Sequence, residues 1–263
     1  MPAKESVIAA ASLCVAAALP GCSAAPSAAD PPVPTTVHST AHPTARPAQA
    51  AFAFTVAGDR PVLPGGSQDT HAQTPNARCD SATFAADKAL GARVARAFAL
   101  AGFPVSADLL AHFLTGTGTG VNYRAGSPIA KKALTSGAFR ALNADVTKAI
   151  LGQLKAGRTR VRLSAAQLPA VAFESTSSDL YWGFRGTQGL TVTGHGTREN
   201  GRYAGTLSYV IRDSYGFPVG DTLDGFGPPM RYLQTACGAP RHAGGAHWFP
   251  DTITVTVPFN RPA

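Results

Sequence analysis

The residues best suited to chemistry lie in RDSYGF, residues 212 to 217, where an apolar, strand-like run ends in charge and aromatic rings. A carboxylate such as Asp213 can hold a divalent cation or take a proton from water, provided that a second acid or a histidine lies beside it. The same stretch has a structural interpretation, in which Tyr215 and Phe217 pack against neighbouring strands and Asp213 caps the turn that follows. The sequence leaves both interpretations open.

A second pattern lies upstream, at the expected end of a helix: His112-Phe113-Leu114-x-Gly116-x-Gly118. In this order, followed by Asp213-x-Tyr215, the chain resembles the activity domain of the colicin M family, bacterial toxins that cut the lipid-pyrophosphate precursor of peptidoglycan outside the membrane. The resemblance covers about residues 105 to 225. It implies Asp213 and Tyr215 as catalytic residues and magnesium as the cofactor.

The chain departs from that family at two places. Gly216 stands where the family has a second acid, and Thr222-Leu223 stands about where it has a His-Arg pair. A phosphoesterase of this type needs acids to hold the cation and a histidine to move a proton or position the nucleophile. Asp221, Asp224 or His247 could take these roles only through folding.

Two further patterns carry less chemistry. Gly116, Gly118 and Gly120 resemble a phosphate loop in composition, but they follow a helix and lack the Lys-Ser/Thr pair, so we interpret them as a flexible connection. His242 and His247 lie near Asp251 with a spacing that fits no standard zinc site. We therefore predict no metal site apart from magnesium under the colicin M-like alternative.

Periodicity predicts the elements that must position these residues. Apolar residues recur at helical spacing over residues 81 to 101, 106 to 114 and 136 to 156, with Ser81 and Ser106 at the first two starts. Gly116 and Gly157 follow the second and third of these helices as stop signals.

After Gly157 the period changes to two, which is typical of antiparallel strands with one wet side. Each of two strands has one apolar face: Tyr203, Leu207, Tyr209 and Ile211 in the first, and Ile253, Val255, Val257 and Phe259 in the second. Glu199-Asn200-Gly201 supplies a hairpin turn. We expect an α+β fold in which N-terminal helices pack on a twisted antiparallel β-sheet.

The start of the chain predicts export. An apolar run from Val7 to Leu19, too short for a span of about 20 residues, ends in Pro20-Gly21-Cys22. Gly before Cys resembles a bacterial lipobox, although Pro20 departs from the small residue usual there, and an ordinary secretory signal is the alternative. The resemblance implies that Cys22 is acylated, with palmitate among the chains, and anchors the protein to the extracytoplasmic face of the cell membrane.

Domain organisation follows from composition. Residues 1–21 are the expected signal peptide, residues 22–74 an Ala/Pro/Ser/Thr-rich tether that is mostly disordered, and residues 75–263 a single α+β domain. Within the tether range, residues 51 to 74 fit either a strand or a surface segment, and the sequence leaves both open.

Cysteine usage agrees with an oxidising compartment. Of four cysteines, Cys14 lies in the signal and Cys22 carries the lipid, which leaves Cys79 and Cys237 to pair. The bridge would close a loop of about 160 residues, for which the chain-entropy model gives about 5 kcal/mol.

Positive charge gathers in one segment. Residues 124 to 162 contain nine basic side chains and one acid, Asp145, so this segment alone matches the chain's formal net charge of +8. We expect no nucleic-acid partner outside the cytoplasm, whereas anionic lipids and cell-wall polymers are available there; a solvated face without a partner is the alternative. The predicted contact residues are Lys131, Lys132, Arg140, Lys148, Lys155, Arg158, Arg160 and Arg162.

These observations favour a cell-envelope lipoprotein whose domain binds an envelope component without catalysis and needs no cofactor. The alternative is a divergent colicin M-like phosphoesterase acting on lipid-linked peptidoglycan precursor. A fold that brings a second carboxylate or a histidine beside Asp213 in a cleft favours the enzyme. Closed, apolar packing around Tyr215 favours the binding protein.

Overall fold

The computed structural model describes residues 52–61, 78–173, 178–184, 187–218, 225–239 and 241–263. Its centre is a six-stranded sheet with the order β2-β6-β5-β4-β1-β3. The strands are β1 (Phe52–Arg60), β2 (Val121–Tyr123), β3 (Arg160–Leu163), β4 (Gly189–Glu199), β5 (Arg202–Tyr215) and β6 (Phe249–Pro262). Cys14 and Cys22 lie outside the described residues.

The sheet is mixed, not purely antiparallel as expected. β1, β4, β5 and β6 form an antiparallel centre, while β3 pairs with β1 and β2 pairs with β6 in parallel. Parallel neighbours need a long crossover, and here helical segments separate the strands of each parallel pair. The alternating pattern of a single strand does not reveal the direction of its partner.

Residues 52–60 adopt the strand alternative. β1 pairs with β4 along its whole length and with β3 over four residues, and it buries Phe54 and Val56. Although this strand lies in the range assigned to the tether, it is an interior strand of the sheet.

Six α-helices accompany the sheet in the described part of the chain: α1 (Ser81–Leu100), α2 (Pro104–Thr115), α3 (Pro128–Thr135), α4 (Gly137–Lys155), α5 (Asp179–Phe184) and α6 (Gly227–Thr235). A short 3-10 turn, η1 (Ala165–Gln167), follows β3. The class is α+β as predicted, but the helices are not an N-terminal layer, because β1 precedes them and α5 and α6 alternate with the later strands.

Capping residues explain where the helices begin and end. Asp80, not Ser81, caps α1 by accepting from the Thr83 N–H, and Ser136 caps α4 in the same way through Phe139. α2 begins at Pro104, two residues before the expected start, since proline is well tolerated in the first turn of a helix. Gly116 ends α2 with φ 71°, as the sequence predicted.

The β4–β5 hairpin turns at Asn200 and Gly201, whose φ values are 50° and 71°, and this confirms the predicted turn. From there β5 pairs with β6 in one unbroken register, from Arg202 opposite Pro262 to Tyr215 opposite Phe249. The buried residues of β5 therefore alternate without interruption up to its end.

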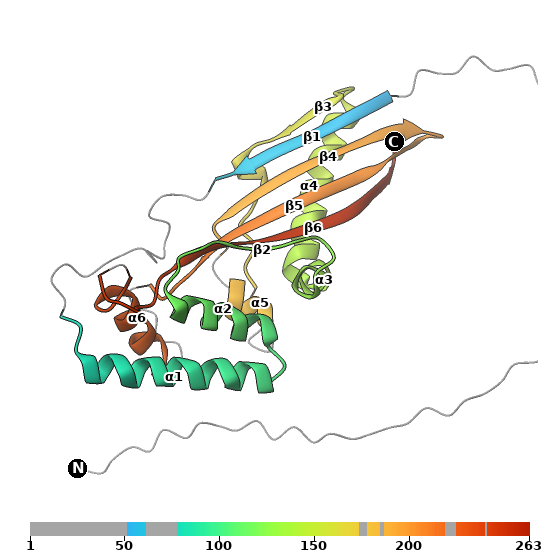
Figure 1. Ribbon diagram of the computed structural model, residues 1–263. Coiled ribbons are helices and arrows are strands. Elements are labelled where there is room, and N and C mark those ends of the chain that lie inside the picture. The colour runs from blue at the N-terminus through green and yellow to red at the C-terminus, as the bar shows by residue number, and fades with distance from the viewer. Residues whose placement is uncertain (1–51, 62–77, 174–177, 185–186, 219–224, 240) are drawn as a thin grey trace, which may run out of the picture. The chain divides into compact units, whose positions relative to one another are not determined.

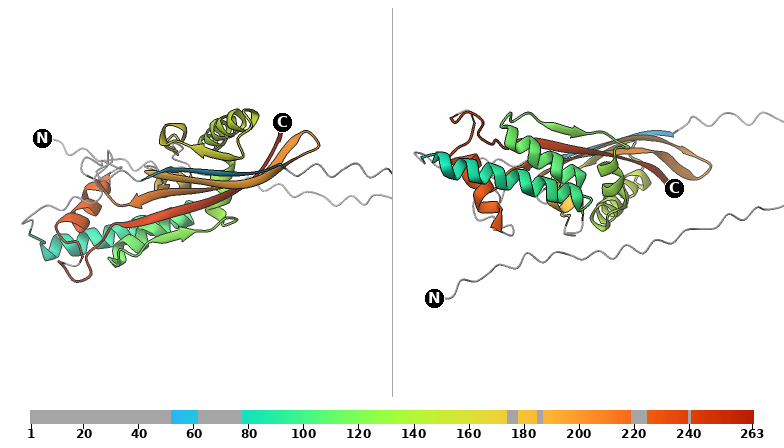
Figure 2. Two further views of the ribbon diagram at one scale, coloured as in Figure 1. Left: turned by 90° about the horizontal axis from the view of Figure 1, so that it is seen from above. Right: turned by 60° about the horizontal axis from the view of Figure 1, so that its bottom comes forward.

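Figure 1 shows α1, α2, α5 and α6 gathered near one end of the strands, while α4 lies against the sheet further along. Tyr209 donates to Asn143 Oδ1 of α4 at 2.7 Å, and Phe113 of α2 contacts Tyr215 at the end of the same strand. Both contacts use the buried face of β5, which turns along its length as the sheet twists (Figure 2).

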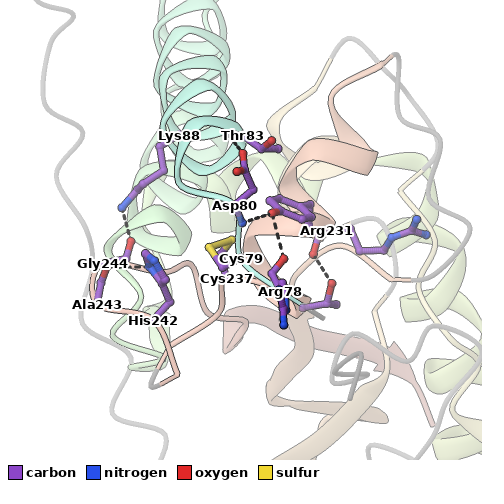
Figure 3. Close-up of a disulfide and its surroundings, with 12 residues drawn as sticks. Arg78, Cys79, Asp80, Thr83, Lys88, Arg231, Cys237, His242, Ala243 and Gly244 are labelled. Atoms are coloured by element: carbon purple, nitrogen blue, oxygen red, sulfur yellow. Dashed lines mark hydrogen bonds between the residues drawn. A yellow bond between two sulfur atoms is a disulfide. The ribbon is translucent and has the colours of Figure 1, made fainter. Parts of the chain in front are cut away.

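The predicted disulfide between Cys79 and Cys237 is confirmed, with Cα atoms 4.9 Å apart. It joins the residue before the α1 cap to the segment after α6 (Figure 3). Beside it the Asp80 N–H donates to the Tyr232 hydroxyl at 2.7 Å, which adds a second link between these helices.

Among the described helices, none has the length and hydropathy required to span a bilayer.

Candidate functional site

Asp213 of β5 and Asp251 of β6 are cross-strand partners in the antiparallel ladder. They lie on the buried face of the sheet: Asp213 is 6% exposed and Asp251 is 0% exposed. Side chains of directly opposed residues in such a ladder have Cβ atoms about 5 Å apart. The fold thus brings a second carboxylate beside Asp213, from a strand that the family pattern did not include.

β5 stays regular through Asp213, so this carboxylate is not turned out to solvent. Its Oδ1 atom accepts the Ser214 N–H at 2.9 Å. The neighbouring Arg212 belongs to the opposite face, where its guanidinium lies 2.7 Å from Asp59 Oδ1. Asp213 is therefore held by a backbone amide and faced by a second acid.

Asp251 has no comparable support. Within the described residues, neither of its carboxylate oxygens has a hydrogen-bond partner. Burial raises the pKa of the Asp251 carboxyl well above its usual range, and the negative charge of Asp213 raises it further. Two acids this close titrate as a pair.

Asp179, at the start of α5, provides an internal comparison, because it is also 0% exposed. Its Oδ1 accepts the Ser106 N–H at 3.0 Å and the Ser106 hydroxyl at 3.1 Å, and its Oδ2 accepts from Lys132 Nζ at 2.7 Å. These contacts tie α2, α3 and α5 together. The same residue type is thus fully supported at one buried position and unsupported at the other.

Aromatic rings enclose the end of the β5–β6 ladder next to the two acids. Tyr215 stacks on Phe249 with centroids 5.4 Å apart, and Phe113 of α2 meets Tyr215 edge-on at 6.2 Å. The His112 ring stands edge-on to Phe249 at 4.5 Å, and its Nε2 atom lies 2.7 Å from the Thr119 carbonyl oxygen. Tyr215 is 8% exposed, so its surroundings are closed and apolar.

The glycine-rich turn after α2 is not a flexible connection, because residues 245–250 pack directly against it. A Cβ atom on Gly116 would lie 1.9 Å from the Gly245 carbonyl oxygen, and one on Gly118 would lie 2.9 Å from His247 Nδ1. The His247 N–H also donates to the Phe113 carbonyl oxygen at 3.2 Å. This close contact with the helix end helps to place the start of β6, and with it Asp251.

β2 closes another side of the site. Its residue Val121 pairs with Asp251, and Tyr123 pairs with Ile253. Burial raises the pKa of the Tyr123 phenol, and the negative charges of Asp251, Asp108 and Asp179 raise it further. The phenol therefore stays protonated at neutral pH.

The structure separates the histidines that the sequence paired. The His242 ring packs on Phe84 of α1 at 4.5 Å, whereas His247 lies against Gly118. In the part of the chain that the structure describes, no group of three or more His, Cys, Asp or Glu residues is placed to hold a metal ion. Asp221, Asp224 and Thr222-Leu223 lie outside the described residues.

The basic segment spreads over several surfaces. Lys132 is committed to Asp179, while Lys131 on the same helix is exposed. Arg160 and Arg162 are exposed on β3, where they alternate with the buried Val161 and Leu163. The exposed Arg140, Lys148 and Lys155 belong to α4, and the exposed Arg158 follows that helix. The eight predicted contact residues do not form one face, and their binding to an anionic partner stays a prediction.

In the sequence, Asp251 stands out only as a neighbour of His242 and His247. A usable signal was present, since Asp251 has the same parity as Ile253, Val255, Val257 and Phe259 and so continues their buried face. Its place opposite Asp213 depends on the β5–β6 register, which no local pattern reveals.

The chain matches no protein-family model, no curated protein and no solved structure.

Proposed function

We propose that this protein is an extracytoplasmic hydrolase that cuts a phosphoester bond of lipid-linked peptidoglycan precursor, with Asp213 and Asp251 as its reacting acids. The observation that carries the proposal is the state of Asp251, which is fully buried opposite Asp213 with both oxygens unpartnered among the described residues. An unsupported buried carboxyl costs about 1–3 kcal/mol or more. Perturbed acids of this kind concentrate at functional sites.

The comparison with Asp179 supports this interpretation. That carboxylate shows that the fold can bury an aspartate with full support from a backbone amide, a hydroxyl and an ammonium group. Asp251 lacks such support although an asparagine or an apolar residue would fit the core at lower cost. A role in chemistry explains why an acid stands there.

The pair has the charge distribution that acid–base hydrolysis needs. In this proposal Asp251, whose pKa is raised by burial, is the acid, and Asp213, whose Oδ1 accepts the Ser214 N–H, is the base. When water attacks phosphorus, its proton passes to Asp213, the bond from phosphorus to the leaving oxygen breaks, and that oxygen takes the proton held by the pair. Because Asp213 is the more exposed of the two, the proposal assigns it the position nearer the substrate.

The resemblance to the colicin M family adds to this argument. Both of its patterns converge here, because the helix end at His112 and Phe113 packs on Phe249 and Tyr215 beside the two acids. The second acid, which is missing at Gly216, comes instead from β6. The location proposed for the protein, anchored through Cys22 on the extracytoplasmic face, is where lipid-linked precursor is displayed.

Magnesium, which the resemblance implies, would need the carboxylates of both cross-strand partners, Asp213 and Asp251, in their ionised form. Asp213 and Asp251 would hold it, with substrate and water oxygens completing the shell, and it would neutralise charge on the pyrophosphate.

A second candidate is the non-catalytic envelope-binding protein. The closed packing of Tyr215 with Phe113, Phe217 and Phe249 favours it, as does the low exposure of both acids. In that case the pair is a buried structural feature, and ligand binding occurs elsewhere on the domain.

Turnover separates the two candidates. The full chain in detergent micelles should release the phosphorylated headgroup from lipid-linked precursor in the presence of magnesium, measured by chromatography. Asp213→Asn and Asp251→Asn should each reduce the rate by a factor of about 100 or more, in the range found for acid–base groups. Asp145→Asn, an exposed acid on α4, is the matched control and should retain the wild-type rate.

Absence of turnover by the wild-type chain, together with retained binding of the precursor, would establish the second candidate instead. Thermal melting of each variant shows whether a lost rate reflects the site or a lost fold.

A further inference from the structure

A hollow of about 510 Å³ lies beside α4, far from the acid pair. Its lining comes from two parts of the chain that are distant in sequence, α4 and one residue of β6, Arg261. The six lining residues of α4 are Ala144, Thr147, Lys148, Leu151, Gly152 and Lys155. Asp251 and Arg261 stand ten positions apart on one strand, which corresponds to about 33 Å. The hollow is therefore a separate site.

The geometry of α4 on the sheet explains why Arg261 takes part. Arg261 is the cross-strand partner of Tyr203, and the Tyr203 hydroxyl donates to the Leu154 carbonyl oxygen of α4 at 3.2 Å. Arg261 continues the parity of Val257 and Phe259, which are buried. Its side chain therefore belongs to the side of the sheet that α4 covers, beyond the last buried residue.

The hollow combines an apolar floor with a positive rim. Leu151, Ala144 and Gly152 present apolar surface, while Lys148, Lys155 and Arg261 supply three cations. No acid occurs among the described residues that line it, and none of the three cations forms an ion pair within the described chain. Asp145 belongs to the same helix but does not line the hollow.

We propose that this hollow binds an anionic phospholipid of the membrane surface, with the headgroup phosphate on the three cations and the upper part of an acyl chain on the apolar floor. Its volume falls within the range of about 300–1,000 Å³ that is typical of small-molecule sites. A solvated basic face would need no apolar floor between its cations. A protein partner would have to match three positive charges around one apolar strip, whereas an anionic lipid carries both features in one molecule.

This inference does not depend on the proposed hydrolase activity. It replaces a general attraction of residues 124 to 162 for anionic surfaces by a defined site, which keeps only Lys148 and Lys155 of the eight predicted contact residues and adds Arg261. Binding at this site would hold the domain against the membrane in one orientation.

The test is sedimentation of the full chain with vesicles of phosphatidylglycerol and phosphatidylcholine, compared with vesicles of phosphatidylcholine alone. The second arm measures membrane binding that does not depend on headgroup charge, including the contribution of a lipid at Cys22. The triple variant Lys148→Gln/Lys155→Gln/Arg261→Gln should lose about a hundredfold in affinity for the anionic vesicles, since each cation near such a surface contributes about fivefold. Its binding to phosphatidylcholine should not change.

The matched control, Arg124→Gln/Arg160→Gln/Arg162→Gln, removes three positive charges elsewhere. All three residues are exposed: Arg124 follows β2, and Arg160 and Arg162 belong to β3. This variant should bind anionic vesicles within about threefold of wild type, because long-range charge is screened within about 10 Å at 0.1 M salt. An equal loss in both triple variants would mean that net charge alone drives binding and would overturn the site.

A second pair of variants tests the apolar floor. Ala144→Glu places a carboxylate inside the hollow, and Ala141→Glu places one at an exposed position of α4 outside it. Only Ala144→Glu should weaken binding by more than about tenfold, given one added repulsion and one lost apolar contact. Similar effects of the two substitutions, or equal binding of wild type to neutral and anionic vesicles, would end the proposal.

Discussion

Asp213 and Asp251 face each other across β5 and β6 on the buried side of the sheet. Asp251 is fully buried and neither of its carboxylate oxygens has a hydrogen-bond partner in the described chain. Its burial, together with the charge of Asp213, raises the pKa of its carboxyl well above the usual range. Asp179 and Asp59 form ion pairs, and Asp80 caps α1. No such contact accounts for an acid at position 251 within the described chain. The pair therefore links the stability of the fold to its proposed chemistry.

The raised pKa of Asp251 makes the stability of the protein depend on pH in a predictable direction. Below pH 4 the residue is protonated in both the folded and the unfolded chain and contributes no difference. As the pH rises, the unfolded chain ionises first, so the free energy of unfolding falls by up to about 1.4 kcal/mol per pH unit until the folded pKa is reached.

Asp251→Asn removes this titration. Relative to wild type, the variant should gain up to about 1.4 kcal/mol, or about 3–6 °C in Tm, per pH unit of rise, and the difference should shrink towards pH 4.5. Thermal melting at both pH values measures it. A gap that stays constant with pH would contradict the raised pKa.

Loss of Asp179 should be costly for the opposite reason. Asp179→Ala leaves the buried Ser106 amide without an acceptor, while the Ser106 hydroxyl keeps the backbone carbonyl of residue 179. Urea unfolding should show a loss of about 2–3 kcal/mol, below the full cost for a buried pair because Lys132 is 44% exposed. Lys132→Met should cost less, since both donors from Ser106 remain. Equal losses would assign the stabilisation to the ion pair alone.

The glycine-rich turn should tolerate no side chain where it meets residues 245–250. Gly116→Ala combines a left-handed φ with a Cβ position 1.9 Å from a carbonyl oxygen, whereas Gly102→Ala has φ 82° and open space. Gly102→Ala should cost about 1–2 kcal/mol, and Gly116→Ala clearly more. Melting temperatures of the two variants compare them directly, and a flexible turn would make the two costs equal.

The disulfide should contribute a large share of stability. Cys79→Ser/Cys237→Ser releases a loop of 158 residues, and denaturant unfolding should show a loss of about 3–5 kcal/mol. Tyr232→Phe, which removes only the hydroxyl that meets Asp80, should cost about 1 kcal/mol. If the double variant lost no more stability than Tyr232→Phe, the disulfide would restrict the conformational entropy of the unfolded chain very little.

The lipid anchor remains to be tested at Cys22. If this residue is acylated, Cys22→Ser should move the protein from the detergent phase to the medium in a phase-partition experiment, because the acyl chains supply the membrane affinity. If the wild type and the variant partition into the detergent phase to the same extent, the lipoprotein assignment is wrong.

The features that short sequence patterns predict correctly in this chain are local. A period of two put Asp213 on the same face as Tyr209 and Ile211, Asn200-Gly201 marked the hairpin, Gly116 marked the end of α2, and the cysteine count left one pair. Each of these follows from neighbours along the chain, which is why short patterns carry them.

Tertiary structure alone decided which distant residues meet. The parallel pairing of β3 with β1, the second acid opposite Asp213 and the arginine beside α4 all depend on strand register and helix packing. A shift of one residue in the β5–β6 register would turn Asp251 to the other face. The register is set by the whole buried face of β6, from Phe249 to Phe259. A local pattern within β6 does not predict which residues of β5 it will pair with.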